Sequence, residues 1–169
     1  LDADMVVKIN AVAMKGINDD ELPGFLELIR TKPIDVRFIE FMPVGEGTMW
    51  APDKVWTSAA VQTLSMWAPD KVWTAAEVLE AAAKLADLEP VEQSGRAAGP
   101  ARLWTVRGGK GRLGVISPYS DHFCATCNRL RITSSGNLRT CLFSDKVYRL
   151  RPALRQRKLG IAAVEKIIR

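Results

Sequence analysis

Two apolar stretches near the start of the chain predict buried β-strands. Residues 5–13 and residues 34–42 are rich in Val, Ile, Phe and Ala, and single polar residues interrupt them without ending them. In the first stretch these polar residues include Lys8 and Asn10. Because alternate residues of a strand point to the same face, we expect the two side chains to share one face.

The stretch between the two predicted strands has a helical pattern. It predicts a helix over residues 20–30, with Asn18 or Asp19 as its N-cap and acidic residues in its first turn. Strand, helix and strand joined by short connections predict a βαβ unit. Its two strands are then parallel and buried on both faces.

A nonapeptide follows in two identical copies. Residues 49–57 and residues 66–74 both read Met-Trp-Ala-Pro-Asp-Lys-Val-Trp-Thr. Two copies do not form a solenoid, which needs at least three stacked units. The second copy ends at Thr74, and Glu77 completes a capping box that predicts a helix to about residue 85. The first copy lacks this Glu, so we interpret it as a looped-out local duplication.

From residue 87 the pattern changes to short strands separated by glycine turns. Residues 102–107 and 112–117 flank the sequence Gly-Gly-Lys-Gly, which predicts a β-hairpin. Residues 109–114 formally match the dinucleotide fingerprint G-x-G-x-x-G. That fingerprint requires a helix at this point, whereas Val-Ile-Ser-Pro follows here and indicates a strand. A dinucleotide site is therefore disfavoured.

The composition is that of a globular protein, with 47% apolar and 25% charged residues in a chain of 169. No apolar stretch approaches the roughly 20 residues of a membrane span, and no signal-peptide pattern is present. Three cysteines are an odd, low number, which argues against a disulfide scaffold and favours a reducing compartment. We therefore expect a cytoplasmic protein with no membrane partner.

The net charge of +5 is concentrated at the C-terminus. Residues 146–169 hold eight basic residues and one acidic residue, whereas the rest of the chain holds 16 basic and 18 acidic ones. This segment fits either a solvated helix face or a surface that binds phosphate or RNA. Tyr148 is its only aromatic residue, which weakens an interpretation based on base stacking.

All three cysteines lie within 18 residues, in the pattern Cys124-x2-Cys127-x13-Cys141. The residues before Cys141 predict a hairpin, with strands at 130–133 and 138–143, that returns Cys141 to the C-x2-C loop. Three interpretations remain: unligated buried cysteines, structural zinc, or an iron–sulfur cluster with three thiolates and one open iron. For zinc, His122 is the only histidine, and it is too close to Cys124 to chelate comfortably.

The residues beside the cysteines favour the iron–sulfur cluster. Arg129 and Arg131 alternate with Leu130 and Ile132, so the two guanidinium groups are expected to face the same way and the two apolar side chains the core. Two parallel arginines form a fork that suits a polyphosphate. The alternative interpretation is that the two arginines lie on the surface and contribute only to solubility.

These residues also resemble a known family. The motif Ser117-Pro-x-Ser-x-x-Phe-Cys-x-x-Cys-Asn-Arg-Leu-Arg131, with Gly-x-Leu-Arg-x-Cys-Leu-Phe at 136–143, resembles the C-terminal half of the GTP 3′,8-cyclases. Residues 7–10, 37–43 and 99–101 are similar to late barrel strands and a linker of that family. Its members are radical S-adenosylmethionine enzymes of the first step of molybdenum cofactor biosynthesis.

The resemblance implies roles for matching residues. Cys124, Cys127 and Cys141 would hold the second [4Fe–4S] cluster, whose open iron takes the guanine of GTP. GTP would also be bound by Lys8, Arg129, Leu130 and Arg131. Met42 would lie in the S-adenosylmethionine pocket. The reaction implied is conversion of GTP to (8S)-3′,8-cyclo-7,8-dihydroguanosine 5′-triphosphate, in an enzyme that is a homodimer at full length.

The fold expected on this basis is α/β: the last βαβ portion of a partial TIM-like radical S-adenosylmethionine barrel, followed by a small α+β cluster-binding domain. The expected domains are barrel strands at 1–47, a helical connection with the duplicated nonapeptide at 48–86, a β-rich [4Fe–4S] and GTP domain at 87–145, and a basic helical tail at 146–169.

The sequence departs from the family in three respects. It has no C-x3-C-x2-C motif for the radical-generating cluster, lacks the first barrel strands, and ends without the family's Gly-Gly tail. We therefore expect a fragment that is inactive alone. We also expect no nucleic-acid partner. The alternatives are a zinc-ribbon-like nucleic-acid-binding module and the auxiliary-cluster domain of another radical S-adenosylmethionine enzyme.

Overall fold

The computed structural model describes residues 6–42, 69–93, 99–121, 127, 129–142, 144, 146–156 and 160–168. The chain divides into two compact units. The first consists of Leu1–Pro43 and Trp56–Thr126, and the second of Val44–Val55 and Cys127–Arg169. The first nonapeptide copy lies outside the described residues, as does the start of the second copy.

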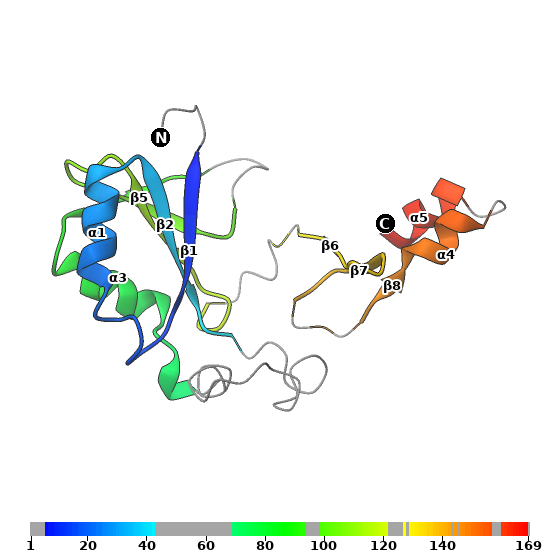
Figure 1. Ribbon diagram of the computed structural model, residues 1–169, viewed down its shortest axis with the longest axis horizontal. Coiled ribbons are helices and arrows are strands. Elements are labelled where there is room, and N and C mark those ends of the chain that lie inside the picture. The colour runs from blue at the N-terminus through cyan, green and yellow to red at the C-terminus, as the bar shows by residue number, and fades with distance from the viewer. Residues whose placement is uncertain are drawn as a thin grey trace. The chain divides into compact units, whose positions relative to one another are not determined.

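The first unit is an α/β structure built on a mixed five-stranded sheet, as expected for the fold class (Figure 1). The strand order is β1-β2-β5-β4-β3, with β1, β2 and β5 parallel and the last two pairs antiparallel. The strands are β1 (Val7–Ala13), β2 (Ile34–Glu40), β3 (Leu88–Val91), β4 (Arg102–Val106) and β5 (Arg112–Ile116). The helical segments are α1 (Leu22–Thr31), η2 (Pro69–Lys71) and α3 (Ala75–Ala83).

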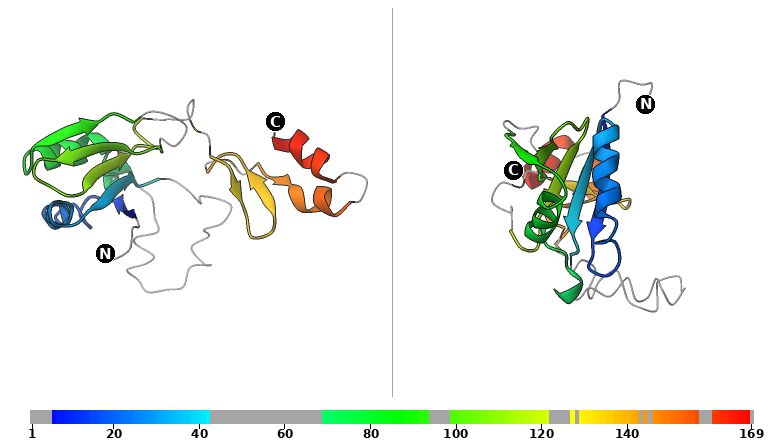
Figure 2. Two further views of the ribbon diagram at one scale, coloured as in Figure 1. Left: turned by 90° about the horizontal axis from the view of Figure 1, so that it is seen from above. Right: turned by 90° about the vertical axis from the view of Figure 1, so that its left-hand side faces the viewer.

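Helices α1 and α3 lie on the same side of this sheet (Figure 1 and the right-hand view of Figure 2). Their buried residues form one core cluster with alternate residues of β2 and β5. At the centre of the cluster is Phe38, whose ring makes edge-to-face contacts with Phe25 at 5.3 Å and Trp73 at 5.9 Å between centroids. Trp73 belongs to the second nonapeptide copy, so this copy contributes to the core.

The predicted βαβ unit is confirmed, but β1 is not buried on both faces. Its exposure alternates, with Lys8, Asn10 and Val12 exposed and the residues between them partly or fully buried. Among the described strands only β2 pairs with β1, so β1 lies at an edge of the sheet. Burial on both faces holds instead for the interior strand β2.

The predicted N-cap of α1 is wrong. The helix begins after Glu21, which makes no side-chain capping bond, and its first turn has a proline and no acidic residue. Asn18 instead donates to the Val12 carbonyl at 2.8 Å and accepts from the Met14 N–H at 3.0 Å. Asp19 accepts from the Gly16 N–H at 2.9 Å. Both polar side chains therefore hold the turn that leaves β1 rather than capping the helix.

The capping box of α3 is confirmed. The Glu77 N–H donates to Thr74 Oγ1 at 3.3 Å, and the Thr74 N–H donates to Glu77 Oε2 at 2.9 Å. Two N–H groups of the first turn, which have no partner within the helix, are satisfied in this way.

The predicted hairpin after residue 102 is confirmed as β4 and β5. Its glycine loop closes on α1, where the Gly111 N–H donates to the Ile29 carbonyl at 2.9 Å. A Cβ atom at Gly111 would come within 2.1 Å of the Ile34 carbonyl oxygen, so only glycine fits. The glycines of the G-x-G-x-x-G segment therefore allow close packing of the loop, and the segment continues into strand β5 and not into a helix. The sequence pattern changes at residue 87, but one sheet contains strands from both sides of this position, because β5 pairs with β2.

The second unit contains a three-stranded antiparallel sheet with the order β6-β7-β8. Its elements are β6 (Arg131–Ile132), β7 (Asn137–Arg139), β8 (Tyr148–Arg149), α4 (Leu150–Arg155) and α5 (Gly160–Ile168). Among its described residues, the buried apolar ones are Leu138, Leu150 and Ala153, a small core compared with that of the first unit. No helix in the described parts of either unit has the length and apolar character to cross a membrane.

Candidate functional site

The β6–β7 hairpin begins at Arg131, two residues after Arg129. Arg131 pairs with Arg139 and Ile132 with Leu138, and Gly136 makes the turn with a φ of 77°. Arg129 and Arg131 are both partly buried, which agrees with a shared face. The expectation that Leu130 and Ile132 face the core is wrong, because they are 52% and 70% exposed.

Cys127 precedes this hairpin, and its thiol is exposed and free. A hydrogen bond from the backbone N–H of Arg129 lowers the pKa of the Cys127 thiol below its ordinary value. The Arg129 side chain and the charge of Arg131 act in the same direction, whereas slight desolvation opposes them. The thiolate is the form that ligates metals, so this environment favours a ligand role.

Cys141 lies at the same open end of the hairpin. Arg129 precedes β6 by two residues and Cys141 follows β7 by two, so both lie just beyond the open end of the hairpin. Cys141 is partly buried and forms no disulfide. Cys124 and His122 lie outside the described residues, within which no group of three metal-ligating side chains is found. The meeting of three thiolates therefore remains a prediction.

Part of the sheet face opposite α1 and α3 is polar, and the rest of it carries a second apolar cluster around Leu103 and Ile116. Lys8 pairs with Asp35 and Asn10 with Arg37, so these four side chains share that face. Asp35 is only 4% exposed and binds Arg112 through two hydrogen bonds of 2.7 and 2.9 Å. Lys8 is exposed beside this ion pair. The arrangement offers a cationic surface to an anionic ligand.

Arg37 lies on this face too and was not among the residues predicted from the sequence. Its Nη2 atom lies 3.3 Å from Asp35 Oδ2, and its buried Nε atom has no hydrogen-bond partner. The available signal was the spacing of two between Asp35 and Arg37 inside an apolar strand. Lys8 and Asn10 have the same spacing in the neighbouring strand, which indicates that their side chains also share one face.

Glu40 is a second residue that sequence analysis missed. It ends β2, is 1% exposed, and accepts hydrogen bonds from the backbone N–H groups of Ala75 at 2.8 Å, Tyr119 at 2.9 Å and Ser120 at 2.8 Å. The Ser120 hydroxyl also donates to it. Burial by itself raises the pKa of Glu40, but these hydrogen bonds outweigh it and hold the pKa below the ordinary value.

Residues 59–169 match the family Molybdenum Cofactor Synthesis C. The chain belongs to this family. Among the curated proteins, it is 40% identical over 149 residues to the GTP 3′,8-cyclase of Syntrophomonas wolfei, covering 88% of this chain and 40% of the relative. The GTP 3′,8-cyclase of Geobacter sulfurreducens is 42% identical over 147 residues, covering 87% and 39%.

A third relative, the GTP 3′,8-cyclase of Clostridium acetobutylicum, is 36% identical over 162 residues, or 96% of this chain and 44% of the relative. The resemblance to GTP 3′,8-cyclases inferred from the sequence motifs is thus confirmed. This member of the Molybdenum Cofactor Synthesis C family spans about two-fifths of the length of these relatives.

The candidate residues of this family member fall in different parts of the chain. Lys8 and Met42 belong to the first unit, and Met42 is a partly buried residue two positions after Glu40. Cys127, Leu130 and the two arginines beside it belong to the second unit. Of these candidates, Cys127 and Arg129 are in contact, through the hydrogen bond from the Arg129 backbone to the Cys127 thiol. The others are described only by their positions in the first or the second unit.

Proposed function

We propose that the protein is a part of a GTP 3′,8-cyclase that binds GTP and holds one [4Fe–4S] cluster. The observation that carries this is the β6–β7 hairpin, where Cys127 precedes the first strand, Cys141 follows the second, and Arg129 and Arg131 are both partly buried. The family match and the names of the relatives support the same activity, conversion of GTP to its 3′,8-cyclic 7,8-dihydro product.

The donor set fits a cluster. Cys127 would be a ligand together with Cys124 and Cys141, and hydrogen bonding already favours its thiolate. A cluster held by three thiolates would supply one open iron to a donor atom of the substrate. S-adenosylmethionine and a further [4Fe–4S] cluster are required by the whole enzyme, in which Met42 would contact the S-adenosylmethionine.

The protein's own residues would bind and orient GTP. Arg129 and Arg131 present guanidinium groups that pair with phosphate oxygens through two N–H groups each. Leu130, the residue between them in the sequence, is 52% exposed and would be a further GTP-binding residue of this segment. Lys8, on the polar face of the first sheet, would add a further charge. Holding the substrate at several points limits its motion, which a reactive radical intermediate demands.

The first unit would form part of a barrel wall. Its parallel strands β1, β2 and β5 have helices on one face, and their other face carries the polar side chains of β1 and β2 beside an apolar cluster around Ile116. All three cysteines of the chain are assigned to one cluster, so none is left for the radical-generating cluster. We therefore expect no turnover of GTP by this chain alone, and we propose a homodimer for the full enzyme.

Anaerobic reconstitution with iron and sulfide tests the proposal. The expected result is about four iron atoms per chain with a broad brown absorption band, and loss of both in Cys127→Ala. GTP should then bind to the reconstituted chain, and Arg131→Gln should weaken it about tenfold or more. Lys166→Gln, which removes one charge of α5, is the matched control. A colourless protein with one tightly bound zinc would contradict the proposal and support the zinc-ribbon alternative.

A further inference from the structure

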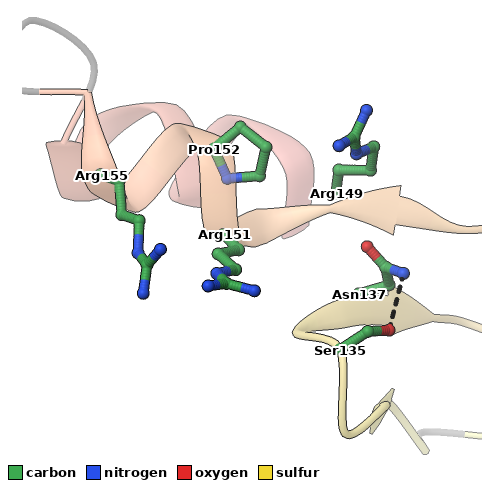
Figure 3. A pocket seen from close by; sticks show the side chains of 6 residues that line it. All are labelled: Ser135, Asn137, Arg149, Arg151, Pro152 and Arg155. Atoms are coloured by element: carbon green, nitrogen blue, oxygen red, sulfur yellow. Dashed lines mark hydrogen bonds between the residues drawn. The ribbon is translucent and has the colours of Figure 1, made fainter.

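A second group of arginines lines an open cavity in the second unit (Figure 3). The cavity has a volume of about 420 Å³ and lies where β7, β8 and α4 meet. Its lining residues are Ser135, Asn137, Arg149, Arg151, Pro152 and Arg155. The cysteines, Arg129 and Arg131 do not take part, so the cavity is separate from the proposed GTP-binding residues.

The backbone holds this lining in place. Asn137 pairs with Arg149 between β7 and β8, and the Leu150 N–H donates to the Gly136 carbonyl at 3.3 Å. The start of α4 is thereby tied to the hairpin turn that carries Ser135. In Figure 3 the side chains of Arg151 and Arg155 extend from the same side of α4.

Among the described residues, these arginines have no carboxylate partner of the kind that the arginines of the first unit have. In the first unit every described arginine lies within 4 Å of a carboxylate, in ion pairs of Arg30, Arg37, Arg102, Arg107 and Arg112. No such ion pair is found for the three arginines of the cavity among the described residues, and no lining residue is acidic. Arg151 and Arg155, four residues apart on α4, repel each other.

We propose that this cavity is a binding site for a polyphosphate anion. Guanidinium groups bind phosphate oxygens in pairs, and an anion with several charges removes the repulsion between Arg151 and Arg155. Polar side chains complete the lining: Asn137 Nδ2 donates to Ser135 Oγ at 3.1 Å and keeps its second hydrogen for a ligand.

A neighbouring cavity of about 370 Å³ suggests where the rest of a larger ligand lies. It shares Ser135, Arg151 and Arg155 with the first cavity and adds the apolar side chains of Ile132, Leu150 and Leu154. Ile132 and Leu154 are 70% and 55% exposed, so both are available for contact. A nucleoside attached to the polyphosphate would cover this apolar side.

The test is calorimetric titration of the full 169-residue chain with tripolyphosphate and with ATP at fixed ionic strength. An Arg129→Gln/Arg131→Gln background removes the proposed GTP-binding pair, so failure of the proposed function does not affect the result. In this background, Arg151→Gln/Arg155→Gln should weaken tripolyphosphate binding about tenfold or more. Lys146→Gln/Lys166→Gln removes the same two charges outside the cavity and should weaken it about twofold or less.

A second variant distinguishes loss of binding from loss of folding. Ser135→Asp keeps all three arginines and introduces a negative charge into the lining, so it should also abolish saturable binding. ATP that binds more tightly than tripolyphosphate assigns the site to a nucleoside polyphosphate, and equal affinity assigns it to polyphosphate alone. Absence of saturable binding, or an equal loss in the lysine control, would overturn the proposal.

Discussion

The backbone N–H of Ser120 donates a hydrogen bond of 2.8 Å to the carboxylate of Glu40, although the two residues are 80 positions apart. The same carboxylate binds the first N–H of α3, at Ala75. Glu40 thus ties the end of β2 to the start of α3 and to the segment that leads from β5 towards Cys124. A buried carboxylate with four hydrogen bonds is well compensated for its desolvation.

Glu40→Gln should therefore destabilise the protein. The glutamine amide has one acceptor oxygen instead of two, and its NH2 group would face N–H donors. We expect a loss of about 2–3 kcal/mol in the free energy of unfolding, because buried donors lose a charged acceptor. Urea denaturation measures it. Glu80→Gln, at the exposed ion pair with Lys84, is the control, and we expect a change of about 0.5 kcal/mol or less there.

The contribution of Glu40 should depend on pH. Its folded-state pKa lies below the ordinary glutamate value of 4.5, so the folded state binds the proton less readily than the unfolded state. The stabilisation is then complete above the unfolded pKa and is lost as the pH falls through the folded pKa. The difference in unfolding free energy between wild type and Glu40→Gln should be constant at neutral pH and shrink on acidification below 4.5. A difference that grows on acidification would contradict this.

Local sequence patterns predicted much of the first unit. The βαβ unit, the Thr74 capping box and the β4–β5 hairpin follow from spacings within a few residues of each other. The pairing of β5 with β2 joins segments more than 70 residues apart, and no local pattern encodes it. The α1 cap was predicted wrongly because Asn18 has two possible uses, and the geometry of the turn after β1 decides between them.

The candidate site shows a similar limit. Alternation predicted Arg129 and Arg131 on one side, and the partial burial of both residues agrees with that prediction. It did not show which face is covered, and Leu130 and Ile132 proved exposed. Glu40 escaped notice because its role depends on N–H groups that arrive from Ala75 and Ser120.

The metal-free, reduced protein should have an unusually reactive Cys127. The Arg129 N–H lowers the pKa of this thiol, so the thiolate forms at lower pH than in an ordinary cysteine. Iodoacetamide alkylation as a function of pH, followed by peptide mass spectrometry, measures the shift. Arg129→Gln should raise the apparent pKa only in part, because the backbone N–H remains. Lys146→Gln removes another positive charge of the second unit as control, and an equal shift there would refute the local cause.

The two nonapeptide copies allow a matched test of the first core. Trp73 is 6% exposed, and its ring contacts Phe38 edge-to-face at 5.9 Å. Trp73→Ala removes this contact and leaves a cavity, so the free energy of unfolding should fall by about 3–5 kcal/mol. Trp56 holds the same position in the first copy, which the sequence predicts to be looped out, so Trp56→Ala should cost about 0.5 kcal/mol or less. Equal losses in the two variants would show that both copies are packed, and denaturant unfolding followed by circular dichroism distinguishes the outcomes.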